Sequence, residues 1–587
     1  NVLYTLKGLS MATIQPRKSH GHKYWYIVES RRVNGKPRPV VLAYLGKAED
    51  LLHRLAGLGE HARVKSYAHG TVAAMLRIAE ELEVPALINK HVAPDRPGGQ
   101  RPLRHHLTVG ATLLLGAIGR ACMPTSKRGW SDWAKTTSCE YLLRTALSKV
   151  DSQHFWDMMN TLPVQAIEAI EQELLERVRQ RYALSADTVF YDTTNFFTFI
   201  ATTNARCTVA QRGKNKQKRN DLRQVGLALV VTREDQIPLF HLTYPGNGSD
   251  CNVFKDILAR IKQRLVALGF DLQKHTLVFD RGNNSKKNLK LVTQAGLHYV
   301  GALTPYQHTA LLERAQGNFA PVTIKEQTLQ VFRTREVVWS EERTLLVFVS
   351  DRLKAGQLRG LHAALKKAED ALSHMQRTIN DPGQRAQTRQ QIEARVAKIT
   401  NRQFVKQLII WSLEEATPGP WQLTFRVDQQ RLEELEKTLG LRILMTDHHD
   451  WPTADIIQAF HGQAHVERAF KNVKNPHHLA VRPQFHWTDQ KIAVHYFMCV
   501  LGYLMAAILL REARAKANFT GGLNSLLNTL SSIRLAACIT RTGKRGKPKV
   551  NYQLEELDDQ QQHLAKALDI LETHIRRPKI SGFSVYT

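Results

Sequence analysis

Two short apolar segments, each with one carboxylate near its end, constrain the fold of this chain more than any other feature. Residues 189–194 read Val-Phe-Tyr-Asp-Thr-Thr and contain Asp192, and residues 277–282 read Leu-Val-Phe-Asp-Arg-Gly and contain Asp280. Both predict buried β-strands. A carboxylate beside an apolar strand is costly unless it is paired, protonated or bound to a cation. Taken alone, each aspartate is more typical of a turn or a helix cap, but together they predict an acidic site at a sheet edge.

The charge balance predicts a polyanionic partner. The chain carries 82 Lys and Arg against 53 Asp and Glu, so its net charge is +29 over 587 residues. DNA or RNA bound through its phosphates is the leading interpretation, and a ribosome-associated or merely soluble basic protein is the alternative. None of the six cysteines forms a CxxC pair, which predicts neither a disulfide framework nor structural zinc and suits a reducing cytoplasm. The apolar run at 496–510 is too short to span a bilayer, so we expect a core helix.

A third acid is available on a predicted amphipathic helix late in the chain. Glu467 and Lys474 are seven residues apart, and at about 100° per residue they share a face of roughly 80° with Phe460, Gln463 and Lys471. That face would present one carboxylate and two ammonium groups beside an apolar stripe. An ordinary surface helix with charge pairs one or two turns apart explains the pattern equally well.

For metal-dependent cleavage of a phosphodiester, the protein needs to supply little more than carboxylates that converge on one site. Two divalent cations about 4 Å apart can activate the attacking oxygen and stabilise the leaving oxygen. Mg²⁺ prefers carboxylate oxygens and keeps several of its waters. Together with the basic charge, the three acids make metal-dependent chemistry on nucleic acid the leading hypothesis.

The predicted elements divide the chain into an α/β core with flanking helical regions. Strand signals alternate with a helix between 185 and 303. Asn34-Gly35 lies between two strand-like runs and predicts a basic β-hairpin. A heptad seam at 358–379, resumed at 392–399, predicts an antiparallel helical hairpin. The expected boundaries are 1–10 for upstream or added sequence before Met11, 11–58 for the basic hairpin, 59–182 for a helical DNA-binding or dimerisation domain, 183–305 and 446–515 for the two parts of the core, 306–445 for an insertion with strands and helices, and 516–587 for a basic helical region.

Several motifs occur in a fixed order along residues 185–510. They are Tyr191-Asp192-Thr193-Thr194, then residues 279–285 (Phe-Asp-Arg-Gly-Asn-Asn-Ser), then Glu467 with Lys474, with further similar segments at 221–225, 244–250, 440–447 and 481–483 and at His495. In this combination the chain resembles the DDE transposases of bacterial insertion sequences, in the IS-four superfamily with its Y-R-E-K signature, and in particular its sixteen-thirty-four group. The third motif departs from the family at Phe460, where a tyrosine is expected, and at Gln463, where an arginine is expected. The carboxylate of Glu467 is retained. The two residues that differ are those that usually contact the DNA backbone in this family.

The resemblance implies an α/β protein with an RNase H-like catalytic core, interrupted by a mixed insertion domain between Asp280 and Glu467. It implies that Asp192, Asp280 and Glu467 are the catalytic residues and hold two Mg²⁺ or Mn²⁺ ions. It further implies a bacterial, nucleoid-associated transposase that binds the terminal inverted repeats of its element as a homodimer, cuts the double-stranded DNA at the ends and joins the 3′-ends to target DNA. A nuclease with the same core but no strand transfer, and a non-catalytic DNA-binding derivative, are the alternatives. Neither a membrane nor a small-molecule substrate is expected.

Basic residues close to these motifs are the predicted DNA contacts. The run 206–223 predicts a flexible basic loop beside the site that binds phosphates, with an ordinary solvated loop as the alternative. Arg468 or Lys471 is expected to compensate for Gln463. Residues 447–450 (Asp-His-His-Asp) invite interpretation as a metal site, but neighbouring residues rarely converge on one ion, so we predict a turn. The predicted contacts are Arg212, Lys214, Lys216, Lys218, Arg219, Arg223, Arg281, Arg468, Lys471, Lys474 and Arg482.

Overall fold

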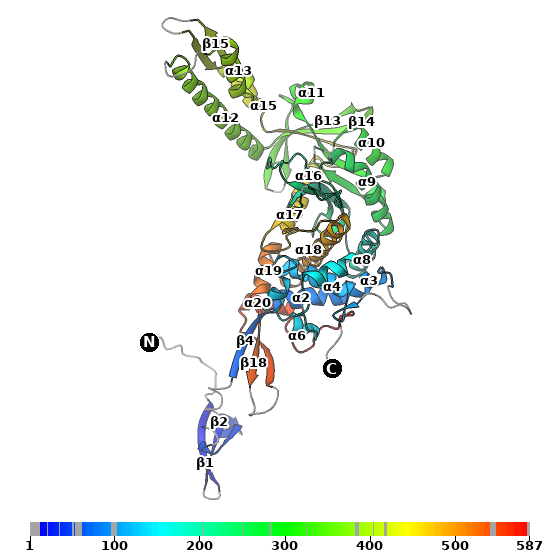
Figure 1. Ribbon diagram of the computed structural model, residues 1–587, viewed down its shortest axis with the longest axis vertical. Helices are drawn as coiled ribbons and strands as arrows, with labels where there is room; N and C mark the ends of the chain where they lie inside the picture. Colours follow the sequence, from blue (N-terminus) through cyan, green and yellow to red (C-terminus); the bar gives the residue numbers. More distant parts are fainter. Residues whose placement is uncertain are drawn as a thin grey trace.

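The protein, seen in a computed structural model, is elongated and built around one large mixed sheet with many helices (Figure 1). A small N-terminal sheet lies at one end and a helical tip at the other. The structure describes residues 12–19, 22–33, 36–49, 52, 62–94, 103–201, 203–215, 217–248, 250–280, 282, 284–324, 326–381, 387–402, 404–415, 420–540 and 548–583.

Five strands form one side of the sheet, from the edge strand β9 inward, in the order β9-β8-β7-β10-β11. β7 (Thr188–Thr198), β8 (Arg223–Thr232) and β9 (Pro238–Pro245) form an antiparallel meander. β10 (Thr276–Phe279) and β11 (His298–Leu303) run parallel to β7. β8 is buried over nearly its whole length, which requires cover on both faces of the sheet and explains its continuous apolar sequence. α9 (Asp250–Ala267) and α10 (Lys286–Ala295) make the connections to β10 and β11.

Four strands from the predicted insertion continue this sheet beyond β11. β17 (Leu441–Thr446) pairs antiparallel with β11, and β14 (Glu341–Val349), β13 (Gln327–Val338) and β12 (Ala320–Ile324) follow, each antiparallel to its neighbour. α11 (Thr309–Ala315) precedes β12. These four strands of the predicted insertion therefore belong to the large sheet, while its other two described strands form a separate two-stranded sheet. The domain boundaries themselves stay a prediction.

The tip has a hydrophobic cluster of its own. Along α12 (Asp351–Thr378) the heptad positions are buried, as the seam predicts, and they pack against α13 (Arg389–Thr400). The rest of the tip consists of α14 (Val405–Leu408), β15 (Ile409–Glu414), β16 (Gln422–Val427) and α15 (Gln429–Thr438). The turn between α12 and α13 falls mostly outside the described residues.

A helical region surrounds α18 (Asp489–Ala517) below the sheet (Figure 1). By length and composition α18 could cross a membrane, but its apolar window is entirely buried, which is typical of a core helix and agrees with the sequence-based expectation. The surrounding helices are α2 (Gly70–Glu81), α3 (Val84–Lys90), α4 (Val109–Cys122), α5 (Trp130–Ala134), α6 (Cys139–Leu143), α7 (Ser152–Asn160), α8 (Ala166–Tyr182), α19 (Leu523–Ser531) and α20 (Asp559–Ala567).

Both chain ends contribute β-structure. β1 (Ala12–Ser19), β2 (His22–Val33) and β3 (Lys36–Gly46) form a three-stranded antiparallel sheet, so the expected hairpin of β2 and β3 carries one further strand. β18 (Arg534–Thr540) lies between β19 (Lys549–Leu554) and β4 (Ala62–Ala68). The prediction of a helical C-terminal region was therefore wrong for β18 and β19. β18 pairs on one side with β19, its neighbour in the sequence, and on the other with β4, a distant partner that a local pattern does not reveal.

Candidate active site

Asp192 and Asp280 follow paired positions of two neighbouring parallel strands. Tyr191 of β7 pairs in register with Phe279 of β10, and each aspartate is the next residue. Because neighbouring strands lie about 5 Å apart, this register places the two acids side by side at the edge where β10 ends. Asp192 is half-buried and accepts a hydrogen bond from the backbone N–H of Thr193 at 2.7 Å, and Asp280 is exposed.

The segment that follows Asp280 is fixed to the next strand. The side-chain amide of Asn284 donates a hydrogen bond to the backbone carbonyl of Ala302 on β11. Gly301 makes room for it, since a Cβ there would lie 2.7 Å from Asn284 Oδ1. Ser285 then caps α10 by accepting from the backbone N–H of Asn288 at 3.1 Å. These contacts explain why the second motif ends in Asn284 and Ser285.

α17 (Gln463–Lys474), which carries Glu467, lies along β7. Near its start the ring of His465 lies 5.6 Å from that of Phe190. At its end Lys474 Nζ donates a hydrogen bond to Thr194 Oγ1 and lies 5.7 Å from the centre of the Phe196 ring. The nine steps along the helix from His465 to Lys474 rise about 13.5 Å, and the four steps along the strand from Phe190 to Thr194 span about 13 Å. Helix and strand therefore run side by side over the stretch that contains Asp192.

This arrangement brings the helix that carries Glu467 against the strand that carries Asp192. Phe190, Asp192 and Thr194 alternate onto one face of β7, and Glu467 lies on α17 between the residues that contact Phe190 and Thr194. Around the helix, Glu467 is only about 20° from Lys474, which reaches the strand. Val466, Phe470 and Val473 form the buried side of α17, while Glu467 is exposed. The structure thus brings the strands of Asp192 and Asp280 and the helix of Glu467 together at one part of the sheet.

The helix predicted to continue through residue 460 is in fact interrupted. α16 (Thr453–His461) ends at Gly462, and α17 begins directly afterwards. A Cβ at Gly462 would lie 2.3 Å from an atom of the Phe190 ring, so only glycine allows this close approach to β7. Phe460 consequently sits on a different helix from Glu467 and is buried. A further loop, residues 475–488, separates α17 from α18.

Glu467 lines a cavity of about 720 Å³ between the two helices and the ends of β14 and β17. Gln463 and Phe460 line the same cavity, as does Arg442 at the start of β17. The Arg442 guanidinium lies 5.7 Å from the centre of the Phe460 ring. A cation thus shares the cavity in which the family arginine is replaced by Gln463. The motif segment 440–447 contains Arg442, but nothing local in the sequence indicates its proximity to Glu467.

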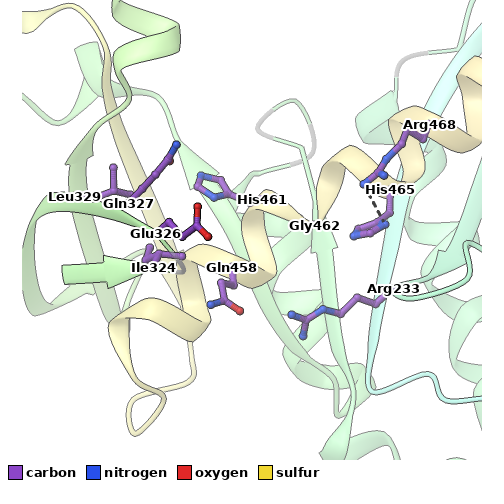
Figure 2. A pocket seen from close by; sticks show the side chains of 10 residues that line it. All are labelled: Arg233, Ile324, Glu326, Gln327, Leu329, Gln458, His461, Gly462, His465 and Arg468. Carbon is purple, nitrogen blue, oxygen red and sulfur yellow. Dashed lines mark hydrogen bonds between the residues drawn. The ribbon is translucent and has the colours of Figure 1, made fainter. Parts of the chain in front are cut away.

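A second cavity of about 670 Å³ opens across the α16–α17 junction (Figure 2). Arg468, His465 and Arg233 lie at one end of it and Glu326 with Gln327 at the other. Arg468 donates a hydrogen bond to the backbone carbonyl of Ala464 at 3.2 Å. Of the two residues expected to compensate for Gln463, Arg468 therefore lines a different cavity from Glu467.

The predicted basic loop between β7 and β8 is anchored rather than loose. Asp489, at the start of α18, accepts hydrogen bonds from the backbone N–H groups of Thr208 and Val209, both at 2.9 Å. Arg219 pairs with Asp221 at 2.6 Å, and the half-buried Arg223 donates to a backbone carbonyl at 3.0 Å. The exposed predicted contacts are Arg212, Lys214, Lys218, Arg219, Arg468, Lys471, Lys474 and Arg482, while Lys216 and Arg281 lie outside the described residues.

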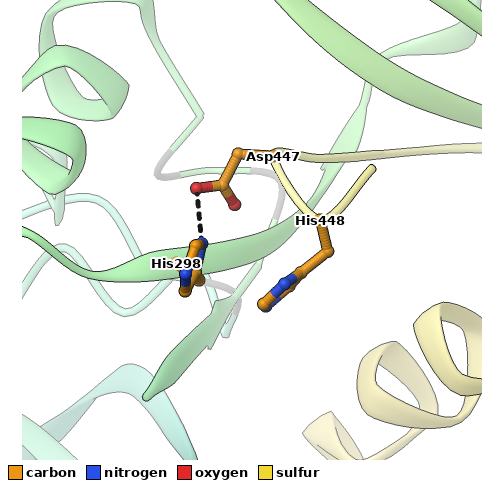
Figure 3. A group of neighbouring side chains, drawn as sticks. All are labelled: His298, Asp447 and His448. Carbon is orange, nitrogen blue, oxygen red and sulfur yellow. Dashed lines mark hydrogen bonds and ion pairs between the residues drawn. The ribbon is translucent and has the colours of Figure 1, made fainter. Parts of the chain in front are cut away.

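Asp447 and His448 lie in a loop after β17, as predicted, and meet His298 of β11 (Figure 3). Asp447 Oδ2 lies 2.9 Å from His298 Nδ1, and the carboxylate also accepts from a backbone N–H. The His448 ring stacks on Trp451 at 3.7 Å, and its centre lies 4.3 Å from that of His298, with the two imidazole planes tilted by 31°. His448 Nε2 lies 2.8 Å from Thr276 Oγ1, and His298 Nδ1 pairs with Asp447, so both nitrogens already have hydrogen-bond partners. We therefore interpret the cluster as a stacked aromatic anchor of this loop.

Two family models match the chain. The transposase DDE domain matches residues 197–499, and the N-terminal domain of the IS1634 family transposases matches residues 12–74. The chain belongs to the DDE transposase family. No curated protein matches the sequence. Among solved structures, a piggyBac transposase synaptic complex with hairpin DNA aligns over 78% of this chain and 79% of its own, with 8% identity and a TM-score of 0.39, which is too distant to transfer detail.

The match to the transposase DDE domain defines the class of enzyme to which this transposase belongs. It establishes a DNA-recombining enzyme of the insertion-sequence type, and metal dependence follows from the family. The match begins at residue 197 and so includes Asp280 and Glu467 but starts five residues after Asp192. Asp192 is therefore placed by the strand register and not by this match.

Proposed function

We propose that the five-stranded side of the sheet from β9 to β11 is an RNase H-like catalytic core. Its strand order, β9-β8-β7-β10-β11, is a three-stranded antiparallel meander followed by two strands parallel to the first. The meander places β7 at the centre of this unit, where two acids from parallel strands can meet a third from a packed helix. This order supports the fold that the motifs imply.

The proposed catalytic residues are Asp192, Asp280 and Glu467. Three carboxylates offer the oxygen ligands that Mg²⁺ and Mn²⁺ prefer, which fits a site for two such ions. When bound, the ions activate the attacking oxygen and stabilise the leaving oxygen. The register of Tyr191 with Phe279, with α17 running along β7, is the single observation that carries this assignment.

Other residues of the chain would hold the DNA at these carboxylates. Lys474 is oriented beside β7 by its hydrogen bond to Thr194, so its ammonium can meet a phosphate next to Glu467. Arg442 supplies a guanidinium in the Glu467 cavity, where Gln463 carries no charge. The anchored loop with Arg212, Lys214 and Lys218 presents further cations beyond the far end of β7.

We infer that the enzyme binds the terminal inverted repeats of its element as a homodimer, cleaves at the ends and joins the 3′-ends to target DNA. In the first step water is the nucleophile and a 3′-hydroxyl is released. In the second step that 3′-hydroxyl attacks a target phosphodiester, one P–O bond forms and one breaks, and a new 3′-hydroxyl leaves. The same three carboxylates can serve both steps because the two reactions are chemically alike.

The test is incubation of the protein with paired end DNA and Mg²⁺, with mapping of the products. Asp192→Asn, Asp280→Asn and Glu467→Gln should each reduce cleavage at least about 1,000-fold while DNA affinity stays within about threefold, because the amides keep size but lose ligand charge. Asp447→Asn is the matched control outside the site and should cleave normally. Cleavage without joining would identify a nuclease. Binding without cleavage by the wild type would identify a non-catalytic protein.

A further inference from the structure

A small cavity on the helical side of the molecule is lined by cations. It measures about 140 Å³ and lies between the end of α4, the turn at 126–128, the first turn of α7 and the segment 483–486. Arg120, Lys127, Arg128 and His486 are among its lining residues. None of them belongs to the three-carboxylate site.

Two of these cations are buried without a counter-charge. Arg120 is 2% exposed and donates to the backbone carbonyls of Ala480 and Arg482 at 3.3 and 3.2 Å. Lys127 is 9% exposed, and its ammonium donates to the sulfur of Met498 at 3.6 Å. In the described part of the chain, neither forms a salt bridge with a carboxylate. Burying a cation in this way is costly unless an anion completes the site.

The electrostatics of neighbouring groups point the same way. Burial, followed by repulsion from Arg120, lowers the pKa of Lys127. Burial, followed by repulsion from Lys127 and Arg120, lowers the pKa of His486. His486 Nδ1 is buried and has no hydrogen-bond partner among the described residues. A bound anion would relieve this repulsion and favour the charged forms.

Exposed aromatic rings surround the mouth of the cavity. Phe485 and Trp487 are 57% and 52% exposed, and Phe199, 62% exposed, lies 6.5 Å from Phe485. Trp156 lines the cavity and contacts Trp487 at 5.9 Å. A cationic pocket with exposed aromatics at its rim is the combination by which proteins bind unpaired nucleotides, with the phosphate in the pocket and the base stacked on a ring.

We propose that this pocket binds one unpaired nucleotide of DNA, with its phosphate against Lys127 and His486 and its base on Phe485 or Trp487. Its volume corresponds to about five waters, which suits a phosphate group. Phe199 lies seven residues beyond Asp192 along β7, about 23 Å away. The nucleotide is therefore bound several steps from the phosphate that reacts. This inference rests on the proposed function to the extent that DNA is the source of the nucleotide.

The experiment measures DNA affinity by fluorescence anisotropy in EDTA, with a single-stranded oligonucleotide and a blunt duplex of the same length. Lys127→Met keeps the length of the buried side chain and removes its charge, and Phe485→Ala removes an exposed ring without disturbing the core. Each should weaken single-strand binding about 10-fold and duplex binding less than twofold. Lys262→Met, an exposed cation on α9, is the matched control and should change neither affinity.

Competition with inorganic phosphate distinguishes a nucleotide of DNA from free phosphate as the ligand of this pocket. At constant ionic strength, inorganic phosphate should weaken single-strand binding by the wild type and have no effect on Lys127→Met. Equal losses on both DNA forms, or no loss on either, would overturn the proposal. Phosphate competition with no effect of Phe485→Ala would indicate a site for free phosphate instead. A wild type that binds single strands through Lys127 but shows no cleavage of paired ends would reject the transposition proposal alone.

Discussion

Gly462 is the residue on which the placement of Glu467 depends most directly. It ends α16 and lets the backbone approach the Phe190 ring, where a Cβ would lie 2.3 Å from a ring atom. Its φ of −61° is accessible to any residue, so the constraint is one of space and not of backbone conformation. A side chain here must push α17, and with it Glu467, away from β7.

We expect Gly462→Ala to destabilise the protein by about 1–3 kcal/mol, the usual range for overpacking, and to reduce cleavage more than DNA binding. Combination with Phe190→Leu, which removes the clashing atom, should restore part of both losses. Gly356→Ala on α12, where nothing lies within 4 Å of the added Cβ, is the control: it should leave cleavage unchanged and stabilise the protein by up to about 1 kcal/mol through helix propensity. Urea unfolding and a cleavage assay measure these effects. Additive losses in the double variant would mean that the two residues do not interact.

His69 gives the stability a pH dependence at the residue scale. Burial, followed by the charge of His574, lowers the pKa of His69 to about 3. Its ring nitrogens lie 2.9 Å from Ser138 Oγ and 3.2 Å from Thr573 Oγ1, so the neutral ring joins distant segments. Unfolded, the ring has a pKa near 6.5. The unfolded state therefore binds the extra proton first, and stability is full above pH 6.5 and falls as the pH is lowered toward 3.

The expected size of this effect is about 2 kcal/mol between pH 6.5 and 5. His69→Gln should be less stable than the wild type at pH 7.5, and the difference should shrink at pH 5. Urea unfolding of both proteins at the two pH values measures this, and the comparison cancels contributions from other histidines. A difference independent of pH would show that His69 titrates normally.

At the scale of elements, the tip behaves as a unit inserted between two paired strands. Val349 at the end of β14 pairs with Leu441 at the start of β17, and the backbone N–H of Ser350 donates to Gly440 at 2.9 Å. The chain therefore leaves and re-enters the sheet at one point. The buried residues of the tip form their own cluster, separate from the main core.

We predict that residues 351–439 can be replaced by Asn-Gly, because that pair closes antiparallel strands in a two-residue turn. The shortened protein should unfold cooperatively, with a melting temperature within about 5 °C of the wild type. Circular dichroism during heating measures this. Deletion of residues 320–349, which removes β12 to β14 from the sheet, is the contrasting variant and should prevent folding. Loss of cooperative unfolding in the first variant would show that the tip supports the core.

Features that follow from short sequence patterns could be predicted from the sequence. Features that depend on contacts between distant residues could not. The strands of Asp192 and Asp280, the heptad seam of α12 and the loop at Asp447 follow from local periodicity and polarity. The break at Gly462 was missed because it depends on Phe190, and the place of Arg442 depends on β17 joining the sheet. The strand β18 was missed because one of its partners, β4, lies near the other end of the chain, and β19 was missed with it because its partner is β18.

For the molecule as a whole, the net charge of +29 is the property most directly tied to its partner. A protein that neutralises six to ten phosphates loses about 1,000- to 100,000-fold in DNA affinity between 50 and 200 mM salt. Exposed cations occur both in the basic loop between β7 and β8 and on α17, the helix that carries Glu467. We therefore expect duplex affinity to fall at least about 1,000-fold over this range.

The contribution of the basic loop to this salt dependence can be isolated. Arg212, Lys214 and Lys218 are exposed, whereas Arg219 is already paired with Asp221 and Arg223 with a backbone carbonyl. Changing the first three to Gln should lower the slope of log affinity against log salt by about 2.7, or 0.9 per phosphate contact. The matched control changes three exposed cations of the tip, Lys366, Lys398 and Lys437, and should leave the slope as it is. If the tip variant lowers the slope and the loop variant does not, the DNA runs along the tip, and the loop between β7 and β8 serves only to fix the start of α18.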